Sequence, residues 1–282
     1  MKIAIVGTGS IGSTFAFQLA RSAHDVTVIA RGKRLEQLQA EKAIVTVSGE
    51  RAAVRVSAAL DPVTDYDLVL VTVLAPQVDS VLPSLQASAA KTVMFMFNTF
   101  ESLDRLRNAV GKERFAFGFP AILASLPGGT LKFRVFARPQ STLVTEEVWA
   151  QVFTEAGIFT VVQDDIESWL RTHAAMVAPM MAVSARVYTR RTGISWAESR
   201  TYALAVREGL ELVRRLGNTV KPAGMAIIGR LPTSLVMAVL WAVSRLKSTQ
   251  NLAQGPSEPR ALIDAMSAAA PEHSWALRAI RP

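Results

Sequence analysis

Six consecutive residues near the start of the chain have the types and spacing of a phosphate-binding turn. They are Gly7, Thr8, Gly9, Ser10, Ile11 and Gly12, which fit the pattern G-x-G-x-x-G. The first glycine permits a tight turn, the second lets the backbone approach a pyrophosphate, and the third lets a helix pack closely on a strand. The following helix would add free N–H groups and a partial positive charge. Although such turns also occur as plain connections, the flanking strand and helix patterns predict dinucleotide binding.

The residues that follow the second predicted strand favour one dinucleotide over the other. That strand, residues 25–30, is followed by Arg31 and Lys33 with no acidic residue at its end. Enzymes that use NAD usually place Asp or Glu there to bind the ribose hydroxyls, whereas an arginine can pair with a 2′-phosphate. The sequence therefore predicts NADP(H), with a solvated basic loop as the alternative interpretation of the same residues.

The elements that must position these residues alternate between strand and helix patterns. Strands are predicted over residues 2–6, 25–30, 43–47, 67–73, 91–97, 114–118, 130–137 and 159–162, and helices over residues 11–22, 77–89, 102–110 and 145–156. We expect the last two strands to close the far edge of the sheet. This alternation is typical of parallel strands joined by crossover helices.

Beyond Asp164 and Asp165 the pattern becomes helical throughout. The predicted fold class is therefore α/β: an N-terminal Rossmann-type doubly wound parallel sheet in residues 1–164, then an all-helical C-terminal domain in residues 165–282.

Several segments together resemble the ketopantoate reductase (2-dehydropantoate 2-reductase) family. They are residues 1–31, residues 68–72, residues 97–101 (Phe-Asn-Thr-Phe-Glu) and the helical second half. The resemblance implies an NADPH-dependent reductase of 2-keto acids, whose small-molecule substrate lies in the cleft between a Rossmann domain and a helical domain.

Three polar residues match positions of the family's motifs. Asn98 matches the asparagine that meets the nicotinamide ribose and the substrate, and helix capping is the plainer interpretation. Gln77 retains half of a Lys-x-x-Gln pattern whose lysine is replaced by Leu74. Glu258 matches a late glutamate near cofactor and substrate, although an acid in the first turn of a helix explains it almost as well.

The family's catalytic lysine is absent from its expected place. It belongs to a Trp-x-Lys motif and donates a proton to the developing alkoxide, but here Arg171 follows Trp169. Arginine stays protonated and is a poor proton donor, whereas His173 has a suitable intrinsic pKa. The two positions differ by about 200° around a helix, so they are competing candidates.

The residues after His173 are apolar where the family has two substrate-binding asparagines. Residues 174–181 read Ala-Ala-Met-Val-Ala-Pro-Met-Met, which indicates a more hydrophobic ketone or imine substrate or, more plainly, helix core. The leading hypothesis is an NADPH-dependent reductase of a small carbonyl compound, and the same residues would serve the reverse reaction. The alternative is a non-catalytic NADP(H)-binding sensor or pathway accessory protein.

The amino-acid composition limits which other kinds of chemistry and partner are expected. The chain has no cysteine and only three histidines, so neither thiol chemistry nor a metal site is expected. Its formal charge of +8 comes with scattered arginines, which predicts no nucleic-acid partner. Arg186, Arg190, Arg191 and Arg200 could form a basic rim for an anion or simply a solvated face. No signal peptide or membrane span is recognised, so a cytoplasmic location is expected, and a homodimer only by family analogy.

Overall fold

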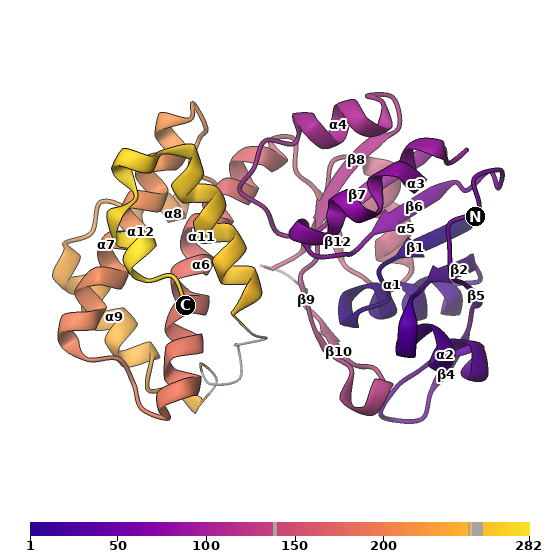
Figure 1. Ribbon diagram of the computed structural model, residues 1–282, viewed down its shortest axis with the longest axis horizontal. Helices are drawn as coiled ribbons and strands as arrows, with labels where there is room; N and C mark the ends of the chain where they lie inside the picture. Colours follow the sequence, from indigo (N-terminus) through magenta and orange to yellow (C-terminus); the bar gives the residue numbers. More distant parts are fainter. Residues whose placement is uncertain (138–139, 248, 250–255) are drawn as a thin grey trace. The chain divides into compact units, whose positions relative to one another are not determined.

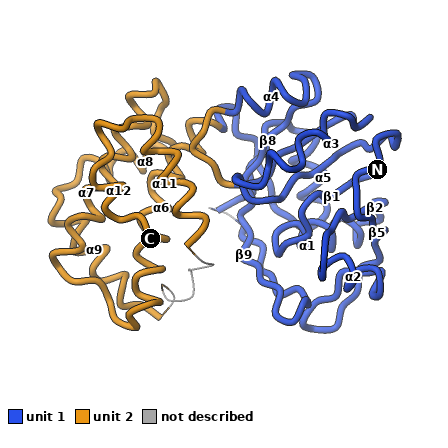
Figure 2. Tube along the Cα trace, viewed as in Figure 1, with its two compact units in different colours: residues 1–97, 103–166 blue, residues 98–102, 167–282 orange. Residues whose placement is uncertain are grey.

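The chain forms two compact units, shown in Figures 1 and 2. The computed structural model describes residues 1–137, 140–247, 249 and 256–282. The first unit contains Met1–Phe97 and Leu103–Ile166, and the second contains Asn98–Ser102 and Glu167–Pro282. A short segment after a strand of the first unit therefore belongs to the second.

The first unit is built on an eight-stranded sheet with the order β12-β11-β8-β7-β6-β1-β2-β5. Its strands are β1 (Lys2–Val6), β2 (Asp25–Ile29), β5 (Arg55–Ser57), β6 (Leu68–Val71), β7 (Thr92–Met96), β8 (Phe115–Phe119), β11 (Thr142–Val144) and β12 (Thr160–Val162). All neighbours are parallel except β11 and β8. Strand order reverses beside β1, which is the switch point of a doubly wound fold, so the predicted fold class is confirmed.

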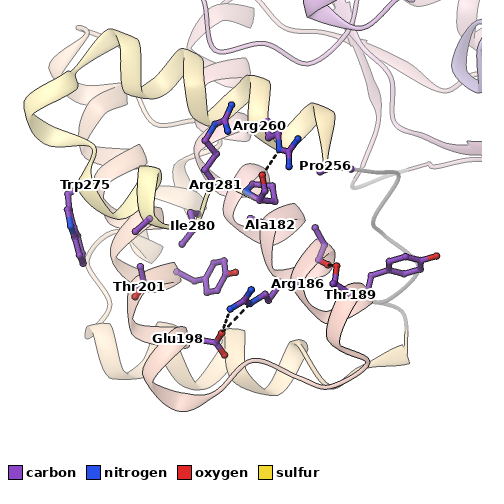
Figure 3. Close-up of a pocket in the computed structure, with 15 residues that line it drawn as sticks. Ala182, Arg186, Thr189, Glu198, Thr201, Pro256, Arg260, Trp275, Ile280 and Arg281 are labelled. Carbon is purple, nitrogen blue, oxygen red and sulfur yellow. Dashed lines mark hydrogen bonds and ion pairs between the residues drawn. The ribbon is translucent and has the colours of Figure 1, made fainter.

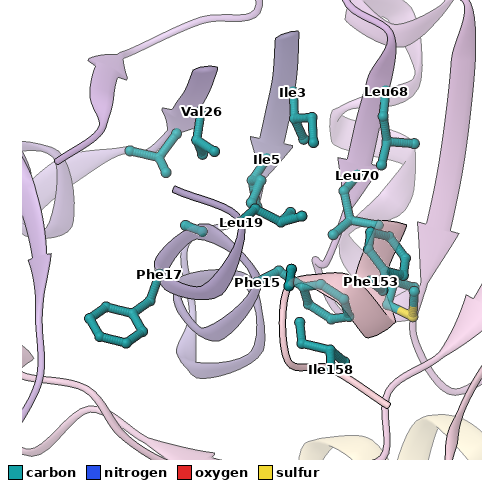
Figure 4. Packing of buried hydrophobic residues seen from close by; sticks show 14 of the residues in the cluster. Ile3, Ile5, Phe15, Phe17, Leu19, Val26, Leu68, Leu70, Phe153 and Ile158 are labelled. Carbon is teal, nitrogen blue, oxygen red and sulfur yellow. The ribbon is translucent and has the colours of Figure 1, made fainter. Parts of the chain in front are cut away.

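The helices of the first unit cover a sheet whose central strands are apolar on both faces. They are α1 (Ser10–Arg21), α2 (Gly32–Glu41), α3 (Leu82–Ala87), α4 (Asp104–Val110) and α5 (Glu147–Glu155), with 3₁₀ turns η1 (Ala75–Ser80) and η2 (Pro127–Gly129). Every residue of β6 is buried, as expected for a strand covered on both sides. Phe15 of α1 and Phe153 of α5 meet edge to face, 5.1 Å apart, beneath Ile5 and Leu70 (Figure 4). This packing fixes the start of α1 against β1.

Two predicted strands lie outside the main sheet. β3 (Ala43–Val45) pairs antiparallel with β4 (Arg51–Ala53), and β10 (Lys132–Val135) pairs antiparallel with β9 (Ile122–Ser125). The expectation that residues 130–137 close the sheet is therefore wrong, because the turn at η2 folds them back on β9. The edge is taken instead by β11, which was not predicted, together with β12.

The single helix predicted over residues 77–89 is also wrong in detail. Proline lacks the N–H that continues a helix and is favoured at the first helical positions. Pro83 accordingly stands at the start of α3, so η1 and α3 form two short elements.

The second unit is helical apart from the short segment Asn98–Ser102. Its elements are α6 (Ile166–Arg190), α7 (Trp196–Arg215), α8 (Ala223–Ile228), α9 (Thr233–Val243), α11 (Ser257–Ala269), the 3₁₀ turn η3 (Pro271–His273) and α12 (Trp275–Ala279). Small residues let α6 and α7 approach closely, since a Cβ at Gly209 would lie 2.9 Å from the Cβ of Ala175. In the described part of the chain, the helices are too short or too polar to cross a membrane.

Candidate functional site

The glycine turn joins β1 to α1 at the carboxyl end of the central strands. Gly7 has a φ of +97°, and its carbonyl accepts a 2.6 Å hydrogen bond from Thr72 Oγ1. A Cβ at Gly12 would lie 2.2 Å from that same carbonyl oxygen. A Cβ at Gly9, by contrast, would meet no protein atom within 4 Å. Packing explains two of the glycines, whereas the third leaves open space at the first turn of a helix.

A cavity of about 490 Å³ opens beside this turn. Its walls come from the ends of β1 and β2 and from the segment around η1, with Gly7, Thr8, Gly9, Arg31, Arg34, Ala58, Gln77, Ser80 and Ser84 among the lining residues. No acidic side chain is among the described residues that line it. The shape and polarity fit a dinucleotide, because the open face of Gly9 and a helix N-terminus border one side and an arginine borders another.

The predicted cofactor residues differ in how they meet this cavity. Gln77 lines it, and its Oε1 accepts a 3.2 Å hydrogen bond from the backbone N–H of Leu74. Lys33 is exposed and is not among the lining residues. Ser10 and Ile11 begin α1 behind the turn.

Arg34 stabilises the glycine turn through hydrogen bonds. Its Nη2 donates a 2.9 Å hydrogen bond to Ser13 Oγ, its Nε donates to the Thr8 carbonyl at 3.3 Å, and its Nη1 donates to the Gly129 carbonyl at 2.8 Å. Burial lowers the pKa of this guanidinium. Arg34 is thus a structural brace, which leaves Arg31, at the N-cap of α2 and exposed, as the arginine that can reach a ligand.

Asn98 and Glu258 come together in the second unit. Asn98 Nδ2 donates a 3.4 Å hydrogen bond to Glu258 Oε1 at the start of α11. Asn98 Oδ1 is buried and has no hydrogen-bond partner among the described residues. Burial raises the pKa of the Glu258 carboxyl, and the hydrogen bond from Asn98 opposes that shift in part. A buried carbonyl oxygen without a donor is costly, so a ligand N–H or O–H would complete this pair.

Arg171 is occupied by protein partners. Its Nε donates to the Phe100 carbonyl at 3.2 Å, its Nη1 donates to Asn218 Oδ1, and its Nη2 lies 2.7 Å from Glu167 Oε1. Phe100 is buried in the core of this unit. The guanidinium therefore fixes the segment that begins with Asn98 and is a positioning group.

His173 lies on a different face of α6 from Arg171, as the angle between them predicts. Its ring stacks on Trp169, with centroids 4.8 Å apart and planes 9° apart. Burial lowers the pKa of this imidazole to about 4. The expectation that His173 titrates near neutrality is corrected by this environment, because the neutral ring is the form present at pH 7.

Sequence reasoning missed the polar network around the first turns of α6. Asn218 Nδ2 donates to Ser168 Oγ at 3.1 Å, and the Lys221 N–H donates to Thr172 Oγ1 at 3.1 Å. The only signal in the sequence was the turn at Gly217, which says nothing about its distant partners.

Known proteins match this combination of a doubly wound sheet and a helical unit. The family model for ketopantoate reductase PanE/ApbA matches residues 3–143. The 2-dehydropantoate 2-reductase of Bacillus subtilis (strain 168) is 35% identical over 111 residues, which cover 38% of this chain and 36% of that protein. The aligned part is therefore well under half of that curated relative's length.

Solved structures of other proteins have the same fold over almost the whole length of this chain. A PanE/ApbA family ketopantoate reductase from Ralstonia eutropha JMP134 has a TM-score of 0.76 at 22% identity, covering 100% of this chain and 96% of that one. A D-mandelate dehydrogenase solved with NADH has a TM-score of 0.73 at 17% identity, covering 99% and 96%. The fold is the two-unit fold that this solved reductase and this solved dehydrogenase share. The chain belongs to the ketopantoate reductase PanE/ApbA family, as its resemblance predicted.

The different surroundings of two glycines give a matched test of the turn. Gly9→Ala should change the free energy of unfolding by no more than about 1 kcal/mol, yet weaken the binding of a nicotinamide dinucleotide at least about tenfold. Gly12→Ala should cost about 3 kcal/mol, because its Cβ would clash with the Gly7 carbonyl. Urea unfolding and nucleotide fluorescence titration measure the two effects. Equal losses of stability in both variants would contradict this account.

The Arg171 network gives a second test. Arg171→Ala should lower the free energy of unfolding by about 3 kcal/mol, since it leaves Glu167, Asn218 and the Phe100 carbonyl without their shared donor. Arg171→Lys should recover part of this loss. The control is Arg214→Ala, which removes an exposed ion pair with Glu211 and should cost less than about 1 kcal/mol. If both alanine variants unfold alike, Arg171 has no positioning role.

Proposed function

We propose that this protein is an NADP(H)-dependent oxidoreductase that interconverts a small carbonyl compound and its alcohol. The observation that carries the proposal is the cavity beside Gly9, which has Arg31 at its border and no acidic lining residue in the described chain. Gly7, Thr8, Gly9, Ser10, Ile11 and Gly12 would hold the pyrophosphate, with Gln77 nearby. Bound there, NADPH supplies a hydride.

Arg31 is proposed to select NADP(H) over NAD(H), with Lys33 as a weaker neighbour. An arginine forms a charge-assisted pair with a 2′-phosphate, and an exposed one can do so without breaking existing contacts. Because Arg34 is already bound to the turn, it contributes mainly by holding the loop.

Arg31→Ala should therefore weaken NADPH binding about tenfold or more while leaving NADH binding within about twofold. Lys33→Ala, in the same helical turn but outside the cavity lining, should have a smaller effect on NADPH. Binding titrations with both nucleotides measure the ratio. A similar loss for NADH and NADPH in Arg31→Ala would argue against phosphate recognition.

Glu258 and Asn98 are proposed to bind the substrate and to transfer its proton. The amide of Asn98 would orient the substrate or the nicotinamide ribose, and Glu258 would exchange the proton at the substrate oxygen. Three candidates compete for that proton. Arg171 is bound to other groups of the protein, and burial lowers the pKa of His173, so its ring is neutral at pH 7. A carboxyl whose pKa is raised by burial, and which is hydrogen-bonded to Asn98, is the better donor.

The pH dependence of turnover separates Glu258 from His173. In the reductive direction the donor must be protonated, so kcat should fall as pH rises through the pKa of Glu258, which lies above its ordinary 4.5. Glu258→Gln retains an oxygen for Asn98 but cannot carry the proton, so it should lose about 100-fold in kcat and the pH-dependent limb. His173→Gln should keep the limb. If Glu258→Gln kept the fall of kcat with pH and His173→Gln lost it, His173 would be the proton donor.

The substrate is proposed to be more hydrophobic than a ketopantoate-sized keto acid. Trp169, His173, Met176 and Met180 follow one face of α6 at spacings of four, three and four residues. None of the four is fully buried, although Met176 also packs against the core of the helical unit. This face has no amide side chain to bind a polar substrate. The structural neighbour D-mandelate dehydrogenase acts on an aromatic hydroxy acid by its name, which agrees with an aromatic or branched side chain here.

A non-catalytic NADP(H)-binding protein is the second candidate. The commitment of Arg171 to a structural network, at the place of the family's lysine, favours it. Tight NADPH binding without turnover on a panel of aromatic and branched 2-keto acids, ketones and imines would support this alternative.

A further inference from the structure

A second cavity, of about 810 Å³, lies wholly within the helical unit. Its walls come from the second half of α6, the start of α7, the first turn of α11, α12 and the residues after α12 (Figure 3). Cavities of about 300–1,000 Å³ hold small molecules in known proteins. None of its lining residues belongs to the set assigned to cofactor or catalysis.

Three arginines border one part of this cavity. Arg260 and Arg281 border it at α11 and the chain end, and Arg186 of α6 lies on the other side beside Glu198 (Figure 3). Glu198 is the one acidic lining residue in the described chain, and it already accepts hydrogen bonds from Arg186, Arg190 and the Ser195 N–H. Its pKa is lowered by these contacts, so it stays ionised and satisfied.

Arg260 keeps donors for another group, whereas Arg281 is paired with an acid. Arg260 Nε donates to the main-chain oxygen of Pro282, and its two Nη groups make no hydrogen bond to the described residues. Arg281 binds Asp264 through Nε and Nη2, at 2.6 and 2.8 Å. Because a guanidinium has five N–H donors in a fixed plane, such sites match the oxygens of a carboxylate or phosphate.

The rest of the lining is apolar and aromatic. Ile280 is buried, whereas the Trp275 ring borders the cavity with 62% of its surface exposed. Tyr202 is buried at the cavity wall, and its hydroxyl makes no hydrogen bond to the described part of the chain. An exposed tryptophan and the unused donors of Arg260 thus border the same cavity.

We propose that this cavity binds a small organic anion with a planar aromatic body. Its carboxylate or phosphate would pair with Arg260 and Arg186, its ring would cover Trp275 and Ile280, and the Tyr202 hydroxyl would donate to it. The inference stands independently of the proposed function, because it uses no residue of the nucleotide cavity or of the Asn98 and Glu258 pair.

Calorimetric titration of the full chain with 1-naphthoate, 1-naphthyl phosphate and neutral 1-naphthol tests the proposal. We expect one site per chain for at least one of the two anions, weaker binding at high salt, and at least about tenfold weaker binding of the neutral probe. Comparison of the two anions identifies the preferred headgroup.

Variants locate the site. Arg260→Gln should weaken the anion about tenfold and Trp275→Ala should weaken it further, with melting temperatures close to that of the parent because both side chains are exposed. Arg278→Gln, an exposed arginine of α12 outside the lining, and Asn98→Ala should leave affinity unchanged. Absence of binding at millimolar probe, equal affinity for 1-naphthol, or loss in Asn98→Ala with no change in Arg260→Gln would each overturn the proposal.

Discussion

The close contact between the Gly7 carbonyl and the first turn of α1 fixes how the central strands meet the first helix. That carbonyl accepts from Thr72 at the end of β6, and it lies where any Cβ on Gly12 would stand. The turn thereby locks together β1, β6 and α1 at the point where strand order reverses. Gly7, Thr8 and Gly9, which border the nucleotide cavity, belong to this turn.

The second unit depends on a different kind of constraint, a buried cation shared among distant segments. Arg171 joins helix α6 to the Phe100 carbonyl and to Asn218, and Glu167 balances its charge. Such a group is expensive to leave unpaired, so each partner is held in place. Arg171 is therefore part of the scaffold of the helical unit.

The parts that could be predicted from sequence are those set by local constraints. The three glycines each satisfy a requirement of one turn, and the apolar run of β6 indicates a covered strand. The position of β10 could not be predicted, because a strand in a separate hairpin and an edge strand of the main sheet have the same residue pattern. The partners of Arg171, which lie 71 and 47 residues away, could not be predicted either. The low pKa of His173 arises from burial, which the sequence alone does not reveal.

The chain passes between the two units at three places, since Asn98–Ser102 belongs to the helical unit while its flanks belong to the sheet. A fragment expressed from residue 167 onward would lack the Phe100 ring, leave a hole in its own core and deprive a guanidinium of a carbonyl. Residues 167–282 alone therefore do not contain the complete core of the helical unit. Chimeras between relatives would have to exchange these five residues along with the helices. Otherwise the helical core of one protein would have to pack against the Phe100 segment of another.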